Sequence, residues 1–362
     1  MELAGDPRYD ADAAYARIQL RPLDRPFAGA EVAMAEAEPI SRVIKTTFSL
    51  ERFSGVDLDE IAARAERWVA DDGIHFILAD LPADDLAELA RRMRDKPALI
   101  LNVSAAEDDL RGKNCQPNLL HTIPSHAMQA DTVAQYLVAR KWPNVLVLQG
   151  SRPEDARIAA ALRRSATRFG LKIVDVRQFQ LTNDPRQREQ SNVSLLTGGA
   201  DYDVVFVADS DGEYGRYVPY QTLHPRPVVG TVGLVPDAWH WSWERNGGPQ
   251  VSSRFEKRAS HRMTGTDWAA WIAVKAIVQS ALRTRSVAYG TNREFLLGDK
   301  MNLDGSKGNP MSFRSWDGQL RQPMLLVTQN AVIERAPIRG FLHQTNDLDT
   351  LGIDRPETQC RQ

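Results

Sequence analysis

The sequence predicts an α/β protein whose parallel strands are covered by helices on both faces. Short apolar, β-branched runs alternate along the chain with segments in which apolar residues recur every three to four positions. This alternation is typical of strand–helix–strand units with parallel pairing. The chain has 362 residues, and a single core rarely grows beyond roughly 250 to 300 residues, so we expect two lobes.

Two helices are predicted in the first part of the chain, and each is followed by a strand. The helices, at 57–71 and 82–94, carry their apolar residues on one face. The strands, at 74–79 and 98–103, are apolar on both faces, which is expected of strands in the middle of a parallel sheet.

The same pattern starts again after Ser125. Further helices are predicted at 125–139 and 153–169, and further strands at 144–149, 171–176, 203–208 and 227–233. A stretch rich in Gly and Pro, at 246–250, then precedes a long predicted helix at 266–282. We therefore expect the chain to cross between the lobes near 246–250, which makes both lobes discontinuous.

The chain changes character beyond Leu296, where glycines punctuate extended segments. The segments at 311–314 and 323–328 flank the dipeptide Asp317-Gly318. This arrangement predicts a β-hairpin.

Composition excludes several classes of protein. Lys and Arg number 45 against 47 Asp and Glu, a net charge of −2, so no nucleic-acid partner is expected. The longest apolar runs have the length of strands and are shorter than the ~18 to 20 residues of a transmembrane helix. Residues 1–10 lack the basic and apolar regions of a signal peptide.

The sequence carries none of the common catalytic signatures. Patterns of the types G-x-S-x-G, H-E-x-x-H and Walker A are absent, as is G-x-G-x-x-G after a strand. We therefore predict a protein that is not an enzyme, with no catalytic residues.

No metal site is predicted either. His121 and His126 are five residues apart, whereas two ligands on one helix face need a spacing of four. The segment 209–213 contains three acidic residues and resembles the start of a calcium loop, but Tyr214 stands where such a loop needs glycine. We expect 209–213 to be a solvated loop.

Tryptophans are concentrated late in the chain, with six of the eight at or beyond Trp239. Trp239, Trp241 and Trp243 alternate, so an extended backbone would place three indoles on one side of the chain, just past a predicted strand. Trp268, near the start of a helix, is a further candidate for a ligand cleft, whereas Trp271 is expected to pack in the core. The alternative is that all these rings fill the core or the contact between lobes.

Arg8, Arg152 and Arg216 are the candidate cations. Each follows a strand-like segment, at the end of the sheet where clefts form in open α/β proteins. Arginine binds carboxylates in a bidentate manner, although a lone arginine is more often simply solvated. The start of the helix at Ser125 offers backbone amides that either bind an anion or are capped by the serine hydroxyl, and capping is favoured.

Several longer strings carry a resemblance to a known family. They are FAGAEVA at 27–33, HTIPS at 121–125 before AQYL at 134–137, and DWAAW at 267–271. On these strings the sequence resembles, over nearly its whole length, the type I periplasmic binding proteins of branched-chain amino-acid transporters. The resemblance implies an exported receptor with two Rossmann-like lobes, parallel central sheets and a hinge of three crossings.

A narrower resemblance rests on LDGSKG at 303–308, SFRSWDGQLRQP at 312–323 and GFLHQTN at 340–346. These strings resemble the subfamily associated with quinoprotein alcohol dehydrogenase systems. The resemblance implies pyrroloquinoline quinone as the bound ligand, no catalytic cofactor, an ABC transporter permease as partner, a periplasmic location and a monomer. A planar tricarboxylate quinone suits indole faces and arginines.

The family's organisation implies lobe boundaries for this chain. The first lobe is expected to comprise 1–121 plus 247–307, the second 122–246 plus 308–345, and 346–362 a C-terminal tail. The family's first strand is represented only by its end, at 1–4, which suggests that an export signal has been lost. If the protein is exported, Cys115 and Cys360, the only two cysteines, are expected to tie the tail to the first lobe.

The family's cleft also implies ligand-binding residues by position. They are Asn102, Ser104 and Ala105, Thr122, Ser151 and Arg152, and Asp209 and Ser210. The loop at 80–82 reads Asp-Leu-Pro where amino-acid receptors usually have small hydroxyl residues, so leucine-type recognition is not expected. Two alternatives stay open: a receptor for another small metabolite or amino acid, and an accessory subunit that docks onto a quinoprotein dehydrogenase through its Trp-rich loop.

Overall fold

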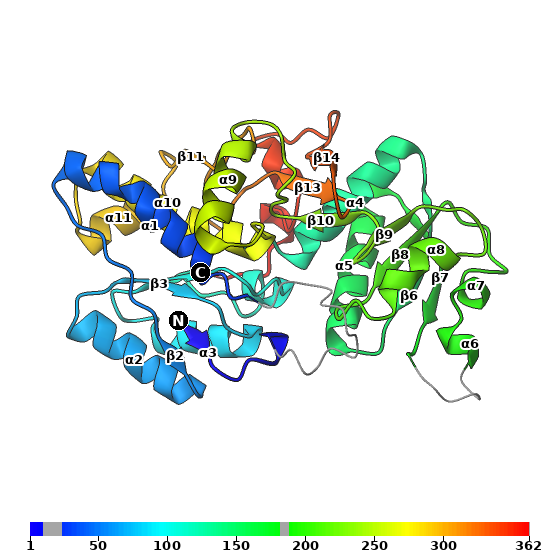
Figure 1. The fold of residues 1–362 in the computed structure, drawn as a ribbon, viewed down its shortest axis with the longest axis horizontal. Coiled ribbons are helices and arrows are strands. Elements are labelled where there is room, and N and C mark those ends of the chain that lie inside the picture. Colours follow the sequence, from blue (N-terminus) through cyan, green and yellow to red (C-terminus); the bar gives the residue numbers. More distant parts are fainter. Residues whose placement is uncertain (10–23, 182–187, 362) are drawn as a thin grey trace.

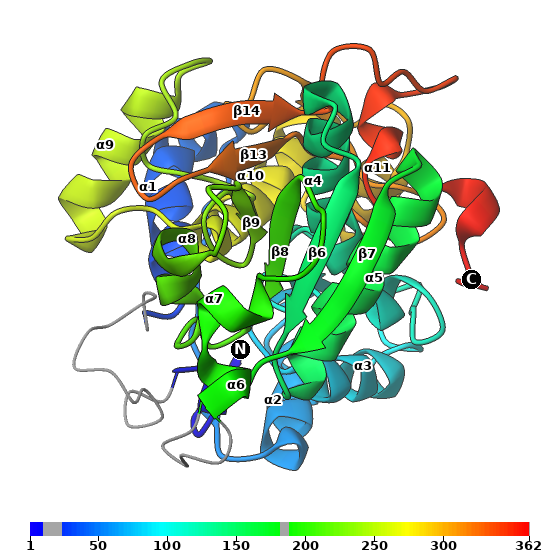
Figure 2. The same cartoon turned by 90° about the vertical axis from the view of Figure 1, so that its right-hand side faces the viewer.

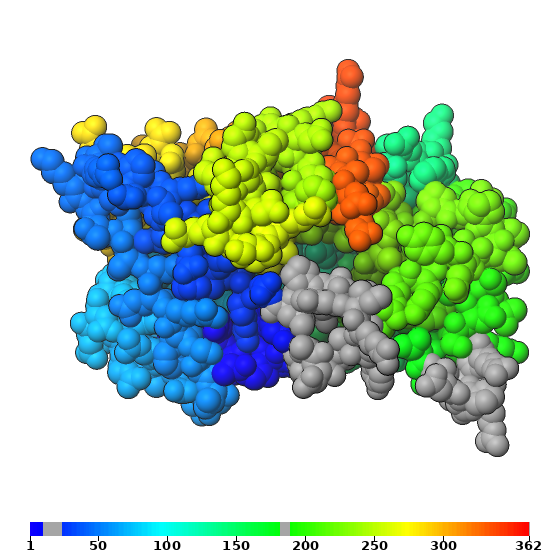
Figure 3. All heavy atoms as spheres, viewed as in Figure 1, coloured from blue at the N-terminus to red at the C-terminus, as the bar shows by residue number. Residues whose placement is uncertain are grey.

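The computed structural model describes residues 1–9, 24–181 and 188–361. Two lobes lie side by side, and each contains a parallel sheet between layers of helices (Figure 1). In the space-filling view they form two masses, with α9 (Gly248–Ala259) and β14 (Val332–Ala336) between them on the upper side (Figure 3). None of the helices in the described ranges has the length and hydropathy needed to cross a membrane.

The first lobe is built on a parallel sheet. Its strands are β1 (Glu2–Leu3), β2 (Ser54–Gly55), β3 (Phe76–Ala79), β4 (Leu99–Asn102) and β5 (Leu119–His121). β1 pairs with β2, and β4 pairs with both β3 and β5. A parallel bridge between Glu2 and Asp80 joins the two parts, so the order across the sheet is β2–β1–β3–β4–β5.

Helices cover both faces of this sheet. α2 (Leu58–Ala70) and α3 (Ala83–Arg92) lie on one face, α1 (Phe27–Ile44) and α10 (Gly265–Thr284) lie on the other, and α9 and α11 (Tyr289–Leu297) pack against this second pair. Side chains of β4 alternate between the two cores: Ile100 packs with α2 and α3, whereas Leu99 and Leu101 pack with α1 and α10. A Cβ on Gly29 would lie 2.0 Å from the carbonyl oxygen of Asp267, so the glycine permits the close approach of α1 and α10.

The second lobe contains a four-stranded parallel sheet (Figure 2). Its order is β7 (Lys172–Gln178), β6 (Asn144–Gln149), β8 (Val204–Ala208) and β9 (Val228–Gly230). The helices α4 (His126–Arg140) and α5 (Pro153–Phe169) pack on one face, and the short helices α7 (Val193–Leu196) and α8 (Val218–Gln221) pack on the other, with α6 (Arg188–Ser191) beside α7.

A small antiparallel sheet lies between the lobes. Its order is β10 (Val235–Asp237), β13 (Met324–Val327) and β14. Leu325 belongs to the core of the first lobe, and its neighbour Leu326 belongs to the core of the second. Because successive residues of a strand point to opposite faces, this sheet contributes to both cores at once.

Most predicted elements are confirmed to within a few residues. The strand at 144–149 and the helix at 153–169 have the predicted bounds, and the helices at 57–71, 82–94 and 266–282 are present as α2, α3 and α10. The predicted hairpin is confirmed only in part. The chain does turn back around Gly318, where the Arg314 amide donates to the Gln319 carbonyl and the Arg321 amide to the Ser312 carbonyl, both at 2.9 Å. The predicted second arm at 323–328 is wrong, because β13 pairs instead with β10 and β14, and Pro310–Met311 (β12) pairs with Leu303–Asp304 (β11).

The chain passes between the lobes in three places. It leaves the first sheet after β5 through 122–125, returns after β10 through 238–247, and reaches β13 through 312–323. We call these segments the first, second and third passage. We propose that the lobe boundaries expected from the sequence follow these passages.

The C-terminal tail is attached to both lobes. Within it, the buried Asp349 bonds Arg314 at 2.8 Å and Arg321 at 2.9 Å, and the Gly352 amide donates to Asp131 of α4 at 2.7 Å. At its end Cys360 forms a disulfide with Cys115 of the first lobe, with a Cα–Cα separation of 5.6 Å. The pairing expected from the sequence is therefore confirmed.

Removal of this disulfide should destabilise the protein. The bridge closes a loop of 245 residues, and in the chain-entropy description such a closure stabilises the fold by roughly 5 to 6 kcal/mol. We expect the double variant Cys115→Ser/Cys360→Ser to show a loss of this order in urea denaturation under oxidising conditions. A reductant should lower the wild type to the same value and leave the double variant unchanged; equal stabilities would refute the expectation.

Candidate functional site

Polar side chains follow the carboxyl ends of the parallel strands in the first lobe. Arg8, after β1, donates to Ser104 Oγ at 3.1 Å, to Asp80 at 3.2 Å and to Asp6 at 2.7 Å. Asp80 in turn accepts hydrogen bonds from Tyr9 at 2.9 Å and from Arg25 at 3.1 Å. The structure thus brings Arg8 and Ser104 together, with the charge of Arg8 compensated by two carboxylates of its own lobe.

Two further predicted residues of this lobe are buried. Ala105 and Thr122 are 1% and 0% exposed. The Asn102 side chain accepts from the Ala105 amide at 2.9 Å, and Thr122 Oγ1 donates to the Asn102 carbonyl at 3.1 Å. In this conformation the three residues fix the backbone at the ends of β4 and β5.

In the second lobe, a cavity of about 620 Å³ lies at the ends of β6 and β8. It brings together four of the predicted residues, Ser151, Arg152, Asp209 and Arg216. The half-exposed Arg152 pairs with Asp211 at 2.6 Å, and Arg216 lies 3.7 Å from Glu213.

An aromatic pair forms part of the lining of this cavity. The rings of Phe179 and Tyr214 are stacked with centroids 4.1 Å apart and an angle of 7° between their planes. The cavity therefore combines an apolar wall with two arginines whose charges are compensated by nearby carboxylates.

The acidic loop at 209–213 is not the solvated loop that was expected. Asp209 and Glu213 are 4% and 5% exposed. Asp209 Oδ2 accepts from the Gly215 amide at 2.6 Å, because the chain turns back into a short 3-10 helix at Gly215–Tyr217. Burial, together with a hydrogen bond to Asp211, raises the pKa of Asp209 to about 7.

A second cavity, of about 410 Å³, lies on the other side of the end of β8 and is lined by Ser210. Its polar wall includes His126, Thr231 and Asp237, and its apolar wall includes Phe206 and Ile158. Burial opposes protonation of His126, but its hydrogen bond to Glu154 at 2.5 Å raises the pKa of the imidazole. Burial raises the pKa of Asp237 to about 6.

The start of α4 is capped rather than open to an anion. The amide of His126 donates to the Ala106 carbonyl at 2.9 Å, that of Ala127 to Asp108 at 2.9 Å, and that of Met128 to the Ser125 hydroxyl at 3.3 Å. The favoured alternative, simple capping, is confirmed.

The Trp-rich segment is not extended, so the predicted row of three indoles is wrong. The Trp243 amide donates to the His240 carbonyl at 3.0 Å, which closes a turn. Trp239 and Trp243 are 1% and 5% exposed and belong to the core of the first lobe, whereas Trp241 is partly exposed beneath the Arg262 guanidinium. The turn places the indoles in different surroundings.

Trp268 is also in the core of the first lobe, where it is 0% exposed. Its ring lies parallel to that of Trp239, with centroids 6.4 Å apart, and the Lys307 ammonium is 3.6 Å from its centroid. Neither Trp239 nor Trp268 lines the two cavities of the second lobe. Packing within the apolar core of the first lobe therefore accounts for both residues here, as it does for Trp271.

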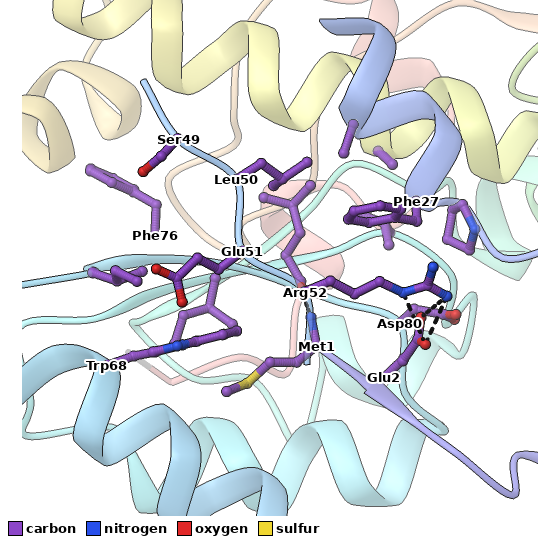
Figure 4. A pocket seen from close by; sticks show the side chains of 17 residues that line it. Met1, Glu2, Phe27, Ser49, Leu50, Glu51, Arg52, Trp68, Phe76 and Asp80 are labelled. Atoms are coloured by element: carbon purple, nitrogen blue, oxygen red, sulfur yellow. Dashed lines mark hydrogen bonds and ion pairs between the residues drawn. The ribbon is translucent and has the colours of Figure 1, made fainter. Parts of the chain in front are cut away.

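A third cavity, of about 110 Å³, lies in the first lobe, where residues of α1, α2, β3 and the segment 49–52 meet (Figure 4). Phe27, Phe76 and Trp68 line it, and Arg52 pairs with Glu2 at its edge at 2.9 Å. Its lining contains neither Arg8 nor Ser104, so we do not include it in the candidate site.

Sequence reasoning missed several residues of the candidate site. Tyr9, Arg25 and Asp80 complete the charge network around Arg8, and Thr231 and Asp237 line the second cavity. Asp80 directly follows the predicted strand at 74–79, which is the same signal that identified Arg152. The other residues follow no recognisable pattern. In the described ranges, no group of three or more His, Cys, Asp or Glu side chains is arranged to hold a metal ion.

Known proteins share this architecture. A family model described as periplasmic binding protein, Peripla_BP_6, matches residues 54–212. No curated protein sequence matches the chain. Among solved structures, an amino acid ABC transporter substrate-binding protein from Pseudomonas fluorescens Pf-5 has a TM-score of 0.69 at 14% identity, with 93% of this chain and 94% of that chain covered.

Two other solved structures are similar. A leucine-, isoleucine-, valine-, threonine- and alanine-binding protein from Brucella ovis, in a closed conformation, has a TM-score of 0.67 at 15% identity, covering 88% of this chain and 90% of its own. A solute-binding protein from Rhodopseudomonas palustris BisB5, in complex with 3,4-dihydroxybenzoic acid, has a TM-score of 0.61 at 10% identity, covering 85% and 90%. The chain has the type I periplasmic binding protein fold, which confirms the fold class predicted from the sequence.

The buried Asp209 should make stability depend on pH. An aspartate in an unfolded chain titrates near 3.9, whereas Asp209 in the folded protein titrates at about 7, so the native state binds more protons between these values. The stabilisation that the protonated Asp209 gives to the folded state is therefore full at low pH and is lost as the pH rises through about 7. The free energy of unfolding of Asp209→Asn minus that of the wild type should therefore be larger at about pH 8 than at about pH 5, by on the order of 2 kcal/mol.

Urea denaturation at both pH values measures this difference. The exposed Asp201 of the same lobe serves as the control, because Asp201→Asn removes a carboxylate of the same lobe without changing a buried group. A pH-independent difference for Asp209→Asn would contradict the expectation.

Proposed function

We propose that the protein is a periplasmic solute-binding protein that delivers a small molecule to the permease of an ABC transporter. The observation that carries the proposal is the placement of polar side chains at the carboxyl ends of two separate parallel sheets. Arg8 and Ser104 follow strands of the first lobe, and Arg152 and Asp209 follow strands of the second. In α/β proteins this is the edge at which ligands bind.

Binding would work through closure of the lobes. A ligand that contacts both lobes makes its full set of contacts only when they are close together, so it shifts the population toward the closed state by the free energy of those contacts. No chemical step is needed, and we propose that the protein is not an enzyme and binds no catalytic cofactor. A monomer is sufficient for this mechanism.

The disulfide supports a location outside the cytoplasm. Disulfides persist in oxidising compartments such as the bacterial periplasm and are rare where thiols are kept reduced. The bridge between Cys115 and Cys360 joins parts of the chain that are 245 residues apart in sequence. It is therefore a structural disulfide of the folded protein.

We propose pyrroloquinoline quinone as the first ligand to test. The proposal rests on the resemblance of the strings at 303–308, 312–323 and 340–346 to the subfamily of quinoprotein systems. The cavity of the second lobe adds an aromatic wall, Phe179 and Tyr214, beside Arg152 and Arg216. Because Asp211 and Glu213 already pair with these arginines, the carboxylates of the ligand must compete with them.

This compensation of charge favours a second candidate, a zwitterionic or weakly charged metabolite. The similar structures include proteins named for amino acids and one in complex with an aromatic acid. An accessory subunit of a quinoprotein dehydrogenase is the third candidate. In that case Trp241, the partly exposed indole of the segment 239–243, would be its contact residue.

A titration with pyrroloquinoline quinone tests the ligand proposal. The titration is monitored by tryptophan fluorescence and by quinone absorbance, with leucine as the control ligand. We expect saturation at one equivalent. Arg152→Ala should weaken binding about tenfold, or ~1.4 kcal/mol, because the half-exposed guanidinium faces the cavity. Arg258→Ala, which removes an exposed arginine of α9, should leave affinity unchanged.

A flat titration would reject this ligand and not the receptor. The receptor proposal is tested separately by a thermal-shift panel of small metabolites and by small-angle scattering with any stabilising compound. Compaction on binding supports a receptor. If a stabilising compound leaves the scattering profile unchanged, the receptor mechanism is rejected.

A further inference from the structure

The strings at 303–308 and 312–323 lie outside both cavities of the second lobe. They meet at the place where the chain passes between the lobes. Lys307 comes from the turn between β11 and β12, and Gln322 comes from the third passage. Both side chains are completely buried, at 0% exposure.

One ammonium group connects all three passages. Lys307 Nζ donates to the carbonyl of Ala238, in the second passage, at 2.9 Å, and to Gln322 Oε1, in the third, at 2.8 Å. The Gln322 amide then donates from Nε2 to the carbonyl of Thr122, in the first passage, at 2.7 Å. The relay Ala238–Lys307–Gln322–Thr122 thus joins segments that lie far apart in the sequence.

The surroundings of Lys307 make it an expensive residue to bury. No carboxylate lies within ion-pair distance of its ammonium in the part of the chain that the structure describes, and the Trp268 ring covers one side at 3.6 Å. Burial lowers the pKa of Lys307 well below that of an ordinary lysine, although Asp237 opposes this. A methionine of similar length would fill this space without the cost of desolvation.

A second buried group connects only two of the passages. Arg111 Nε donates to Gln319 Oε1 at 2.9 Å, and Gln319 Nε2 donates to the Ile123 carbonyl at 3.1 Å. These contacts tie the third passage to the first. Of the two groups, the Lys307 relay alone also includes the second passage.

We propose that Lys307 and Gln322 are positioning residues of the hinge, which hold the three passages at one point so that the lobes turn about it as rigid bodies. Each passage is a separate connecting segment of the chain. Without the relay, the second passage keeps its apolar packing and the neighbouring β10–β13 ladder but loses its buried polar connection to the first passage, so the lobes can twist or slide as well as close. The proposal concerns the protein without ligand and does not depend on the identity of the ligand.

The test measures the distance between the lobes in the ligand-free protein. Nitroxide labels are attached to Glu66→Cys in α2 and Thr167→Cys in α5, which are exposed positions in different lobes. Pulsed electron paramagnetic resonance then gives the distribution of distances between the two labels. We expect Lys307→Met to broaden this distribution by several ångströms, which is the scale of hinge and shear motions. Gln322→Met, which retains the bond between Lys307 and Ala238, should broaden it less.

Lys275→Met is the matched control. Its ammonium also lies over a tryptophan of α10, 4.3 Å from the centroid of Trp271, and also donates to a carbonyl, that of Asp304 at 3.0 Å. Its contacts stay within the first lobe, so the distance distribution should remain that of the wild type even if the melting temperature falls.

The possible outcomes separate a positioning role from a merely structural one. A broadened distribution for Lys307→Met and Gln322→Met, with none for Lys275→Met, supports the proposal. A loss of stability with an unchanged distribution overturns it. If Lys307→Met does not fold, Gln322→Met decides by the same criterion.

Discussion

The structure depends on how the backbone is satisfied where it passes between the lobes. A chain that leaves a sheet loses the ladder partners of its carbonyl groups, and buried carbonyls need other donors. In this protein the donors are side chains: Gln322 bonds the Thr122 carbonyl, Lys307 that of Ala238, and Arg111 that of Ile123. Because these side chains satisfy the buried carbonyls of the three passages, each lobe can keep its own apolar core while the chain crosses three times.

The same use of charge is seen at the strand ends. Each of the three arginines predicted to bind a ligand already has a carboxylate partner: Arg8 pairs with Asp6, Arg152 with Asp211, and Arg216 with Glu213. Under the proposed function, a ligand would therefore meet a polar surface with little net charge, and its fit and hydrogen bonds would matter more than long-range attraction.

Local pattern predicted the elements well and their surroundings poorly. The strand at 144–149 and the helix at 153–169 are predictable because their apolar periodicity and their first residues depend only on neighbouring positions in the sequence. The pairing of β13 with β10 and β14, the turn that buries Trp239, and the relay through Lys307 all join distant residues. No single segment carries information on such contacts, so the sequence leaves ligand contact and core packing open for Trp239 and Trp268, and the structure places both in the core of the first lobe.

The disulfide has a consequence for the order in which the protein matures. Cys115 emerges early during synthesis, and Cys360 emerges after the whole of the second lobe. In the folded protein, the docked tail, held through Asp349 and Gly352, brings Cys360 to Cys115 of the first lobe, and the bridge closes a covalent ring. A chain that stops before Cys360 keeps a free thiol at Cys115, so closure of the ring distinguishes complete, folded molecules from unfinished ones.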